Sequence, residues 1–433
     1  MTLPRYRCGI LSQFWGHPGG PVVSRSEIIP YPQAGGRANL NSRALPAVMN
    51  AIPQVKAAFL SRSSKPPKLR EARFDDYSQV AALALKFDLD ADDYEAWAHL
   101  WTGNPAFREI RGKFPMGWVL EAPDGGIAGY FGNIPLSYEF DGKKLLVAAG
   151  RSWVVETAFR TYSLLLLGTY FQQTNVDLFL VTSLNSQSAV PFNVFQGTPV
   201  PVGTWDRTLF WITEPRGFTE SLLRKKGWAA AKPLSYPLSI AISLHDHLMG
   251  NRFRNTGAEF SVLPCEDFDD RFDVFWQGLK EKKSRLLLAV RDRETLQWHY
   301  KFALLRNAAW IYAIEDSRGL AAYAVFLRQD LRRAGLCRVF LADFQCLDQT
   351  KTPAFFTAML RAAFERCRRE SVHMLEVIGL PPHLQASAEG ACPHRRQLPN
   401  WMYFYKTNDR VLADRLSSAE VWEPSLFDGD SSL

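Results

Sequence analysis

A short polar stretch between two apolar segments carries side chains suited to chemistry in the first half of the chain. It begins at Glu156, passes through Arg160 and Ser163, and runs into the apolar residues Leu164–Leu167. Backbone amides that lead into a helix, together with the positive end of the helix dipole, can accept an anion such as a diphosphate. The alternative is an ordinary strand–turn–helix connection with a solvated arginine, in which Glu156 is a surface carboxylate paired with Arg151 or Arg160.

The elements around this stretch predict a sheet with helices on both faces. A strand and a helix come first, followed by an antiparallel meander whose last strand covers 144–157. A helix over 162–173, an apolar strand over 176–182, a helical or turn segment over 188–195 and a last strand over 204–213 complete the first half. This order is typical of an α/β fold (α+β mixed sheet).

The second half of the chain repeats the same order of elements. The pattern predicts a first strand, two helices over 267–278 and 293–304, a meander, a helix over 353–369 and a strand over 374–378. The connection between the halves is predicted to contain a helix around Leu222 and an extended apolar segment over 236–244.

These patterns divide the chain of 433 residues into four parts. Residues 1–66 mix Pro, Gly, Ser and Arg and are predicted to be a disordered basic tail, and the sequence leaves open whether residues 1–48 are translated, because Met49 could be the start. An N-terminal domain over 67–213, a connector over 214–258 and a C-terminal domain over 259–430 follow.

The distribution of charge argues against a nucleic-acid partner. Residues 1–66 hold eight basic side chains and one acid, so the tail alone accounts for the formal charge of +7. The remainder is formally neutral, whereas a protein that binds phosphate backbones gathers Lys and Arg on its folded surface.

Cysteine usage and hydropathy predict a reduced, cytoplasmic protein that does not insert into a membrane. The six cysteines form no CxxC pair, and no window approaches about 20 continuous apolar residues. His245 and His247 flank Asp246, and Cys392 lies near His394, but two ligands at one place do not make a tetrahedral set, so no metal is predicted.

The stretch Val154–Leu167 resembles the strand, loop and helix of the GCN5-related N-acetyltransferase (GNAT) superfamily. That family's loop reads approximately Arg-x-x-Gly-x-Gly or Ala, and here Arg160 occupies the Arg position while Ser163 and Leu165 stand at the two small positions. Leu165 makes the fit for a phosphate tighter than the family pattern. The resemblance implies that acetyl-CoA or another acyl-CoA binds as co-substrate through Val155, Phe159, Arg160, Thr161, Tyr162, Ser163, Leu164 and Leu165.

A second stretch, Val181–Gly197, is similar to the family's strand, Asn, short helix and terminal glycine. The resemblance implies that Asn185 contacts the pantetheine arm. The family often places a Tyr in the next helix to protonate the leaving thiolate, and this chain has Phe192 or Asn193 there instead. Because acyl transfer to an amine needs a general base, Glu156 is the candidate catalytic base, at a place where resembling enzymes often have a carboxylate.

In the second half, Arg291–Tyr300 is similar to an Arg-x-x-x-Leu-x-Trp-x-Tyr element of tandem acyltransferases, which also recurs in FemAB-like proteins. The ending Trp422–Asp430 resembles acyltransferases of polysaccharide gene clusters. Asp343 and Gln345 alternate with apolar residues on a strand, so both point to one face. They are candidate substrate-binding residues in a cleft, and an exposed strand face is the alternative.

The resemblance implies two tandem acyl-CoA N-acyltransferase-like domains and transfer of an acyl group to an amine of a small polar acceptor, such as an amino sugar. One alternative is a catalytically degenerate binding or scaffold protein, which the missing glycines and the missing Tyr favour. Another alternative is a FemAB-like aminoacyl transferase that uses charged tRNA, against which the neutral body argues.

Overall fold

The computed structural model describes residues 65–433 except 88, 90, 111–112, 229–230, 249–259, 332 and 399. The predicted disordered tail and the question of a start at Met49 therefore lie almost entirely outside the described residues, as does the end of the connector. In the described ranges, no helix is both long enough and apolar enough to cross a membrane.

The first sheet has the strand order β1-β2-β3-β4-β5-β15-β6, and β9 pairs with the end of β3. Within the described residues, β4 and β5 form the one parallel pair of this sheet, and the other neighbours are antiparallel. The strands are β1 (Lys68–Glu71), β2 (Gly117–Glu121), β3 (Ile127–Phe140), β4 (Lys143–Val155), β5 (Leu178–Leu184), β6 (Thr198–Pro199), β9 (Leu288–Ala289) and β15 (Met402–Lys406).

The second sheet has the order β14-β7-β13-β12-β11-β10-β8, in which β12 and β13 are parallel. The long strands β10, β11 and β12 form the predicted meander. The strands are β7 (Arg207–Ile212), β8 (Leu263–Cys265), β10 (Ala309–Asp316), β11 (Gly319–Leu331), β12 (Leu336–Cys346), β13 (Met374–Ile378) and β14 (His394–Gln397).

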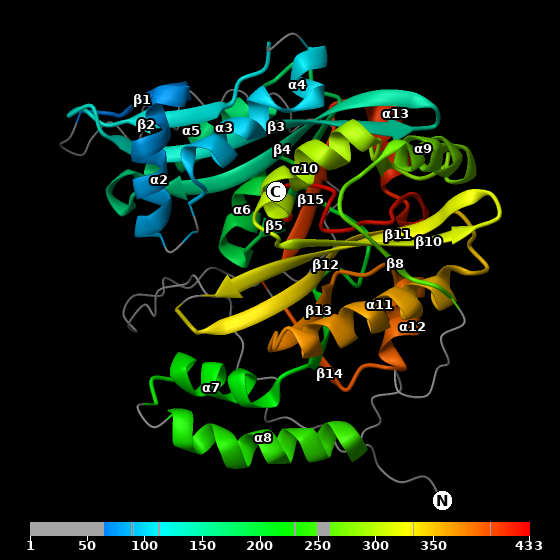
Figure 1. The fold of residues 1–433 in the computed structure, drawn as a ribbon. Coiled ribbons are helices and arrows are strands. Elements are labelled where there is room, and N and C mark those ends of the chain that lie inside the picture. Colours follow the sequence, from blue (N-terminus) through cyan, green and yellow to red (C-terminus); the bar gives the residue numbers. More distant parts are fainter. Residues whose placement is uncertain are drawn as a thin grey trace, which may run out of the picture.

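Helices cover both sheets (Figure 1). Side-chain caps fix several of their starts, because Asp93, Asn104, Asp269 and Asp292 each accept a hydrogen bond from a backbone amide of the first turn. The helices are α2 (Tyr77–Lys86), α3 (Tyr94–Thr102), α4 (Pro105–Glu109), α5 (Ser163–Phe171), α6 (Ser186–Val194), α7 (Pro215–Lys225), α8 (Ala231–Leu248), α9 (Asp270–Lys282), α10 (Arg293–Leu305), α11 (Thr352–Arg369), α12 (Pro382–Glu389) and α13 (Arg410–Leu416).

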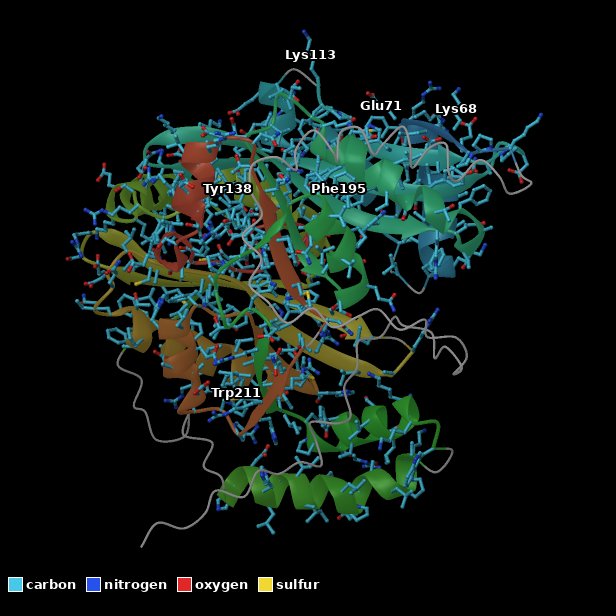
Figure 2. All side chains as sticks on the ribbon, turned by 180° about the vertical axis from the view of Figure 1, so that it is seen from behind. Lys68, Glu71, Lys113, Tyr138, Phe195 and Trp211 are labelled. Carbon is cyan, nitrogen blue, oxygen red and sulfur yellow. The ribbon has the colours of Figure 1, made fainter. Side chains whose placement is uncertain are left out.

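A shared apolar core joins the two sheets. Ile134 and Tyr138 of β3 belong to the same buried cluster as Trp298 of α10 and Tyr323 of β11. Figure 2 shows Tyr138 within the body of the molecule and Trp211 in the part built around the second sheet. The Tyr138 hydroxyl donates to the carbonyl oxygen of Asp428 at 2.6 Å, which ties the first sheet to the end of the described chain.

Strands are exchanged between the two halves of the chain. Strand β7, predicted as the last strand of the first half, pairs with β13 and β14 in the second sheet. Strand β15 from the second half pairs with β5 in the first sheet. Trp211 of β7 is fully buried and Phe210 nearly so, and they belong to different apolar clusters, so both faces of this strand are covered. The two halves therefore cannot separate without breaking sheet hydrogen bonds.

The predicted mixed α/β fold is confirmed, but one prediction in the connector is wrong. The helix around Leu222 exists as α7, whereas residues 236–244 form part of helix α8 instead of an extended segment. In residues 236–244, apolar residues occupy every second position, which is the alternation typical of a strand. The buried positions of α8 are Ala231, Ser235 and Ser239, spaced four residues apart, and the carbonyl oxygen of Ser235 accepts a hydrogen bond from the Thr219 hydroxyl of α7.

Candidate active site

Strands β4 and β5 separate after a short parallel pairing and leave an opening in the first sheet. Their pairing covers only three positions and ends where Ala149 faces Leu180. Beyond this point β4 continues beside β3 up to Val155, while β5 continues beside β15 up to Leu184. Among the described residues, no ladder hydrogen bond joins the two strands beyond this point, and the carbonyl oxygen of Thr182 in β5 accepts a hydrogen bond from the Trp205 indole. A divergence of this kind is a place where an extended ligand can lie between two strands.

Tyr170 of α5 lies where the two strands diverge. Its buried hydroxyl is 2.6 Å from the carbonyl oxygen of Ala148 in β4 and 3.2 Å from the carbonyl oxygen of Leu180 in β5. Burial raises the pKa of this phenol well above its ordinary value, so the hydroxyl keeps its proton and acts as a donor. Helix α5, which follows the polar stretch, thus contacts both of the strands that border the opening.

A β-bulge in β4 lies next to the opening. Tyr130 faces Val154 and Gly132 faces Arg151, which leaves Ser152 and Trp153 opposite a single residue of β3. Ser152 has a φ of 54°, in the left-handed region. The extra residue of a bulge has backbone groups that make no hydrogen bond in the ladder. A free amide of this kind can donate a hydrogen bond to a carbonyl oxygen that gains negative charge during a reaction.

The polar loop after β4 forms a 3₁₀ helix (Thr157–Tyr162) that runs directly into α5. Neither helix start has a side-chain cap. Phe159 donates to Glu156 and Ser163 donates to Arg160, and further amides within the 3₁₀ helix donate to carbonyl groups three residues back. The side chains of Arg160 and Thr161 are exposed. The loop therefore presents the positive charge of Arg160 to solvent, and its helical segment continues into α5 without a break.

The apolar side chains predicted in this loop take different positions. Val155 is buried in the cluster formed by α5 and the sheet, and Phe159 and Tyr162 pack against the same cluster. Leu165 is half-buried, and Leu164 is exposed. Val155, Phe159 and Tyr162 can therefore contact a ligand mainly through backbone atoms.

Glu156 pairs with a residue that the sequence did not suggest. Its carboxylate lies 2.6 Å from Nζ of Lys86 in α2, and its side chain is 31% exposed. Arg151, one of the expected partners, instead lies 2.8 Å from the Asp92 carboxylate. Glu156 follows Ser152 of the bulge by four positions, and the ion pair uses only its Oε1 atom, so Oε2 can accept a proton.

Asn185 begins α6 as its N-cap. Its Oδ1 atom accepts a hydrogen bond from the Ser188 amide at 2.8 Å, and its side chain is exposed. The carboxamide oxygen thus has a structural partner, and the NH₂ group is the part of this side chain that is suited to bind a ligand carbonyl.

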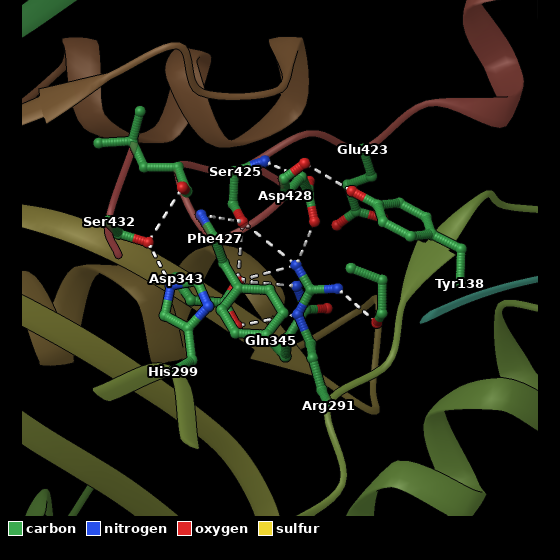
Figure 3. A network of polar contacts seen from close by, with 12 residues as sticks. Tyr138, Arg291, His299, Asp343, Gln345, Glu423, Ser425, Phe427, Asp428 and Ser432 are labelled. Atoms are coloured by element: carbon green, nitrogen blue, oxygen red, sulfur yellow. Dashed lines mark hydrogen bonds and ion pairs between the residues drawn. The ribbon is translucent and has the colours of Figure 1, made fainter. Parts of the chain in front are cut away.

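Asp343 and Gln345 lie in a buried network, and the alternative of an exposed strand face is wrong (Figure 3). Arg291 contacts Asp343 at 2.9 Å and Asp428 at 2.8 Å, and Tyr323 donates to Asp343 at 2.8 Å. Burial raises the pKa of Asp343, but the charge of Arg291 more than offsets this, so its pKa lies below the ordinary value.

The final residues of the chain connect this network to the opening. The Thr182 hydroxyl of β5 contacts Asp430 at 2.9 Å and Ser431 at 2.8 Å, and Arg151 of β4 donates to the carbonyl oxygen of Asp430 at 3.2 Å. Ser432 lies 2.7 Å from Nε2 of His299. Sequence reasoning missed these contacts, because they join positions more than 100 residues apart.

A cavity of about 330 Å³ adjoins this end segment. Elements from both halves line it, since α3 contributes His99, α10 contributes His299 and Arg306, and β11 contributes Arg328 and Asp330. The wall also includes Asp92 and residues 431–433. The space is large enough for a small polar molecule.

Solved structures share this arrangement of elements. A Saccharomyces cerevisiae N-myristoyltransferase with bound myristoyl-CoA is similar with a TM-score of 0.52 and 11% identity over 80% of each chain. A second structure of that enzyme, with myristoyl-CoA and inhibitors, has a TM-score of 0.50 and 12% identity over 79% of this chain and 82% of that chain. The chain has an N-acyltransferase fold.

A third solved structure is less similar. A GCN5-related N-acetyltransferase from Anabaena variabilis has a TM-score of 0.46 and 10% identity over 79% of this chain and 73% of that chain. No family model matches the sequence, and no curated protein sequence matches it. At these identities, the likeness concerns the fold alone.

Proposed function

We propose that the protein is an acyl-CoA-dependent N-acyltransferase that acylates an amine of a small polar acceptor. The observation that carries the proposal is the divergence of β4 and β5 beside the loop with the exposed Arg160 that leads into α5. In an N-acyltransferase fold, such an opening offers backbone edges to an extended thioester and a positive helix end to a diphosphate.

The donor would bind along the opening. Arg160, Thr161 and Ser163, with the backbone of the loop, would hold the pyrophosphate, and the Asn185 NH₂ group would contact the pantetheine arm. The thioester would lie near the bulge at Ser152, whose backbone amides would bind the carbonyl oxygen.

The reaction is the displacement of a thiolate by an amine. The amine nitrogen attacks the thioester carbonyl carbon, a C–N bond forms, and the C–S bond breaks. The nitrogen loses one proton to Glu156, directly or through water, and the thiolate leaves and takes up a proton from solvent to give free coenzyme A. Lys86 pairs with Oε1 of Glu156, so the proton would be accepted by Oε2.

The acceptor would occupy the cavity beside residues 431–433. Its wall contains Asp92 and Asp330, each paired with an arginine, and His99, so an acceptor with several hydroxyl groups, such as an amino sugar, would find both hydrogen-bond donors and acceptors there. The second half of the chain would then supply one wall of the acceptor pocket through α10 and β11.

Calorimetry tests the donor site without knowledge of the acceptor. Acetyl-CoA and longer acyl-CoAs are titrated into the full-length protein. Arg160→Ala should weaken binding about tenfold, because a charge-assisted contact at an exposed position contributes about 1.4 kcal/mol. Arg318→Ala, which removes another exposed arginine at a hairpin of the second sheet, should bind as the unmodified protein does.

Two results would count against this proposal. If no acyl-CoA binds the folded protein, the scaffold alternative is favoured. If Arg160→Ala and Arg318→Ala weaken binding equally, the acyl-CoA does not use the loop before α5.

A further inference from the structure

Helix α8 and the edge strand β14 bring three metal-binding side chains together. His245 and Asp246 lie near the end of α8, and His394 begins β14, almost 150 positions later in the chain. Figure 1 shows α7 and α8 beneath the second sheet, with α8 farthest from the first sheet. His394 is far from the other two residues in the sequence but lies beside them in the fold.

The distances suit one shared ion. Nε2 of His394 lies 2.8 Å from Oδ1 of Asp246, and Nδ1 of His245 lies 3.2 Å from the same oxygen. The ligand atoms of the three residues lie within 4.8 Å of one another. The rings of His245 and His394 are 5.5 Å apart and inclined by 18°. Two imidazoles that bind one zinc ion with Zn–N bonds of about 2.0 Å place their ring centres roughly 5 Å apart.

The His394 nitrogen lies at ion-pair distance from Asp246 but makes no hydrogen bond. Nε2 of His394 is buried, and although Asp246 is close, the direction of approach does not make a hydrogen bond, so this atom has no hydrogen-bond partner. A buried polar atom without a partner is costly. A metal ion between the nitrogen and the carboxylate would satisfy both groups.

The neighbouring side chains hold this arrangement in place. The His394 ring stacks on Phe210 of β7 at 5.0 Å, and its side chain is only 4% exposed. The side chains of Asp246 and His245 are 16% and 32% exposed, so the site opens to solvent from the α8 side. An ion can therefore enter, and a water molecule can fill the remaining position.

We propose that His245, Asp246 and His394 bind a divalent zinc-class ion that attaches α8 to β14. Two imidazole nitrogens and one carboxylate are a ligand set that Zn²⁺ accepts, with water as the fourth ligand. The bound ion would stabilise the α7–α8 pair against the second sheet, since binding to the folded state alone raises stability. The site is separate from the opening between β4 and β5.

Zinc binding by the full-length, tag-free protein tests this inference. After treatment with EDTA and dialysis, titration with Zn²⁺ should show one site per chain and a rise in melting temperature. His394→Ala and His245→Ala should abolish both effects. His245→Ala alters a side chain that is one-third exposed, and unchanged circular dichroism in this variant shows that loss of zinc is not loss of the fold.

Control variants separate this site from adventitious binding by surface histidines. His383→Ala, on α12, should bind zinc as the unmodified protein does. Slower hydrogen exchange in α8 on addition of Zn²⁺ would further support the site. The inference is overturned if the unmodified protein binds no zinc, or if His247→Ala loses the ion while His394→Ala retains it.

Discussion

The pH dependence of stability should reveal the buried His299. Burial lowers the pKa of this imidazole to about 3, and nearby Arg291 and Arg151 act in the same direction against the opposing charge of Asp343. In the unfolded chain its pKa is about 6.5. Between these values the unfolded state binds a proton that the folded state does not bind, so stability falls as pH falls.

The size of the effect follows from these two pKa values. Between pH 7.5 and pH 5.5, His299 alone should lower the free energy of unfolding by about 1.4 kcal/mol. At pH 5.0 the loss should reach about 2 kcal/mol. His299→Gln removes the titrating group and keeps a side chain that can hydrogen-bond to Ser432, which lies 2.7 Å from Nε2.

Urea unfolding at several pH values measures the prediction. The unmodified protein should lose about 1.4 kcal/mol more than His299→Gln between pH 7.5 and 5.5, whatever the absolute stability of the variant. His383→Gln serves as control and should give a smaller difference, because 53% of that side chain is already exposed. Parallel curves for the unmodified protein and His299→Gln would refute the reasoning.

Three further substitutions test the core and the candidate active site. Arg291→Leu leaves two buried carboxylates without their cation and should cost about 3–5 kcal/mol of unfolding free energy, measured in urea. Tyr170→Phe should cost about 1–3 kcal/mol, because carbonyl groups at the diverging strands lose a donor, and should raise the Kd for acyl-CoA. Glu156→Gln should lower kcat about 10²–10⁴-fold with unchanged acyl-CoA affinity, whereas Lys86→Ala should retain turnover; an equal loss in both would contradict the role of Glu156 as a base.

Local sequence patterns predicted most elements of the fold but not their partners. The meander β10–β12 could be recognised because its turns and alternating residues lie close together in the chain. The exchange of β7 and β15 could not, because each strand's local pattern fits either sheet. Helix α8 was misread because Tyr236, Leu238 and Ile240 alternate like a strand while all three are exposed.

The candidate site was predictable only where its residues are neighbours in sequence. Arg160 and the start of α5 follow β4 directly, so the loop could be found from its motif. The partner of Glu156 comes from α2, and the burial of Asp343 depends on Arg291, which is 52 positions away. The cavity and the contacts of residues 430–433 arise from the packing of the two halves, for which the sequence carries no local signal.

A crystal structure of the protein with bound coenzyme A or a non-hydrolysable acyl-CoA would show where the donor binds. We expect the pyrophosphate within hydrogen-bond distance of the backbone amides between Arg160 and Leu165. The pantetheine should lie between the diverging ends of β4 and β5. A cofactor bound elsewhere, or an opening that the cofactor never enters at saturating concentration, would contradict this expectation.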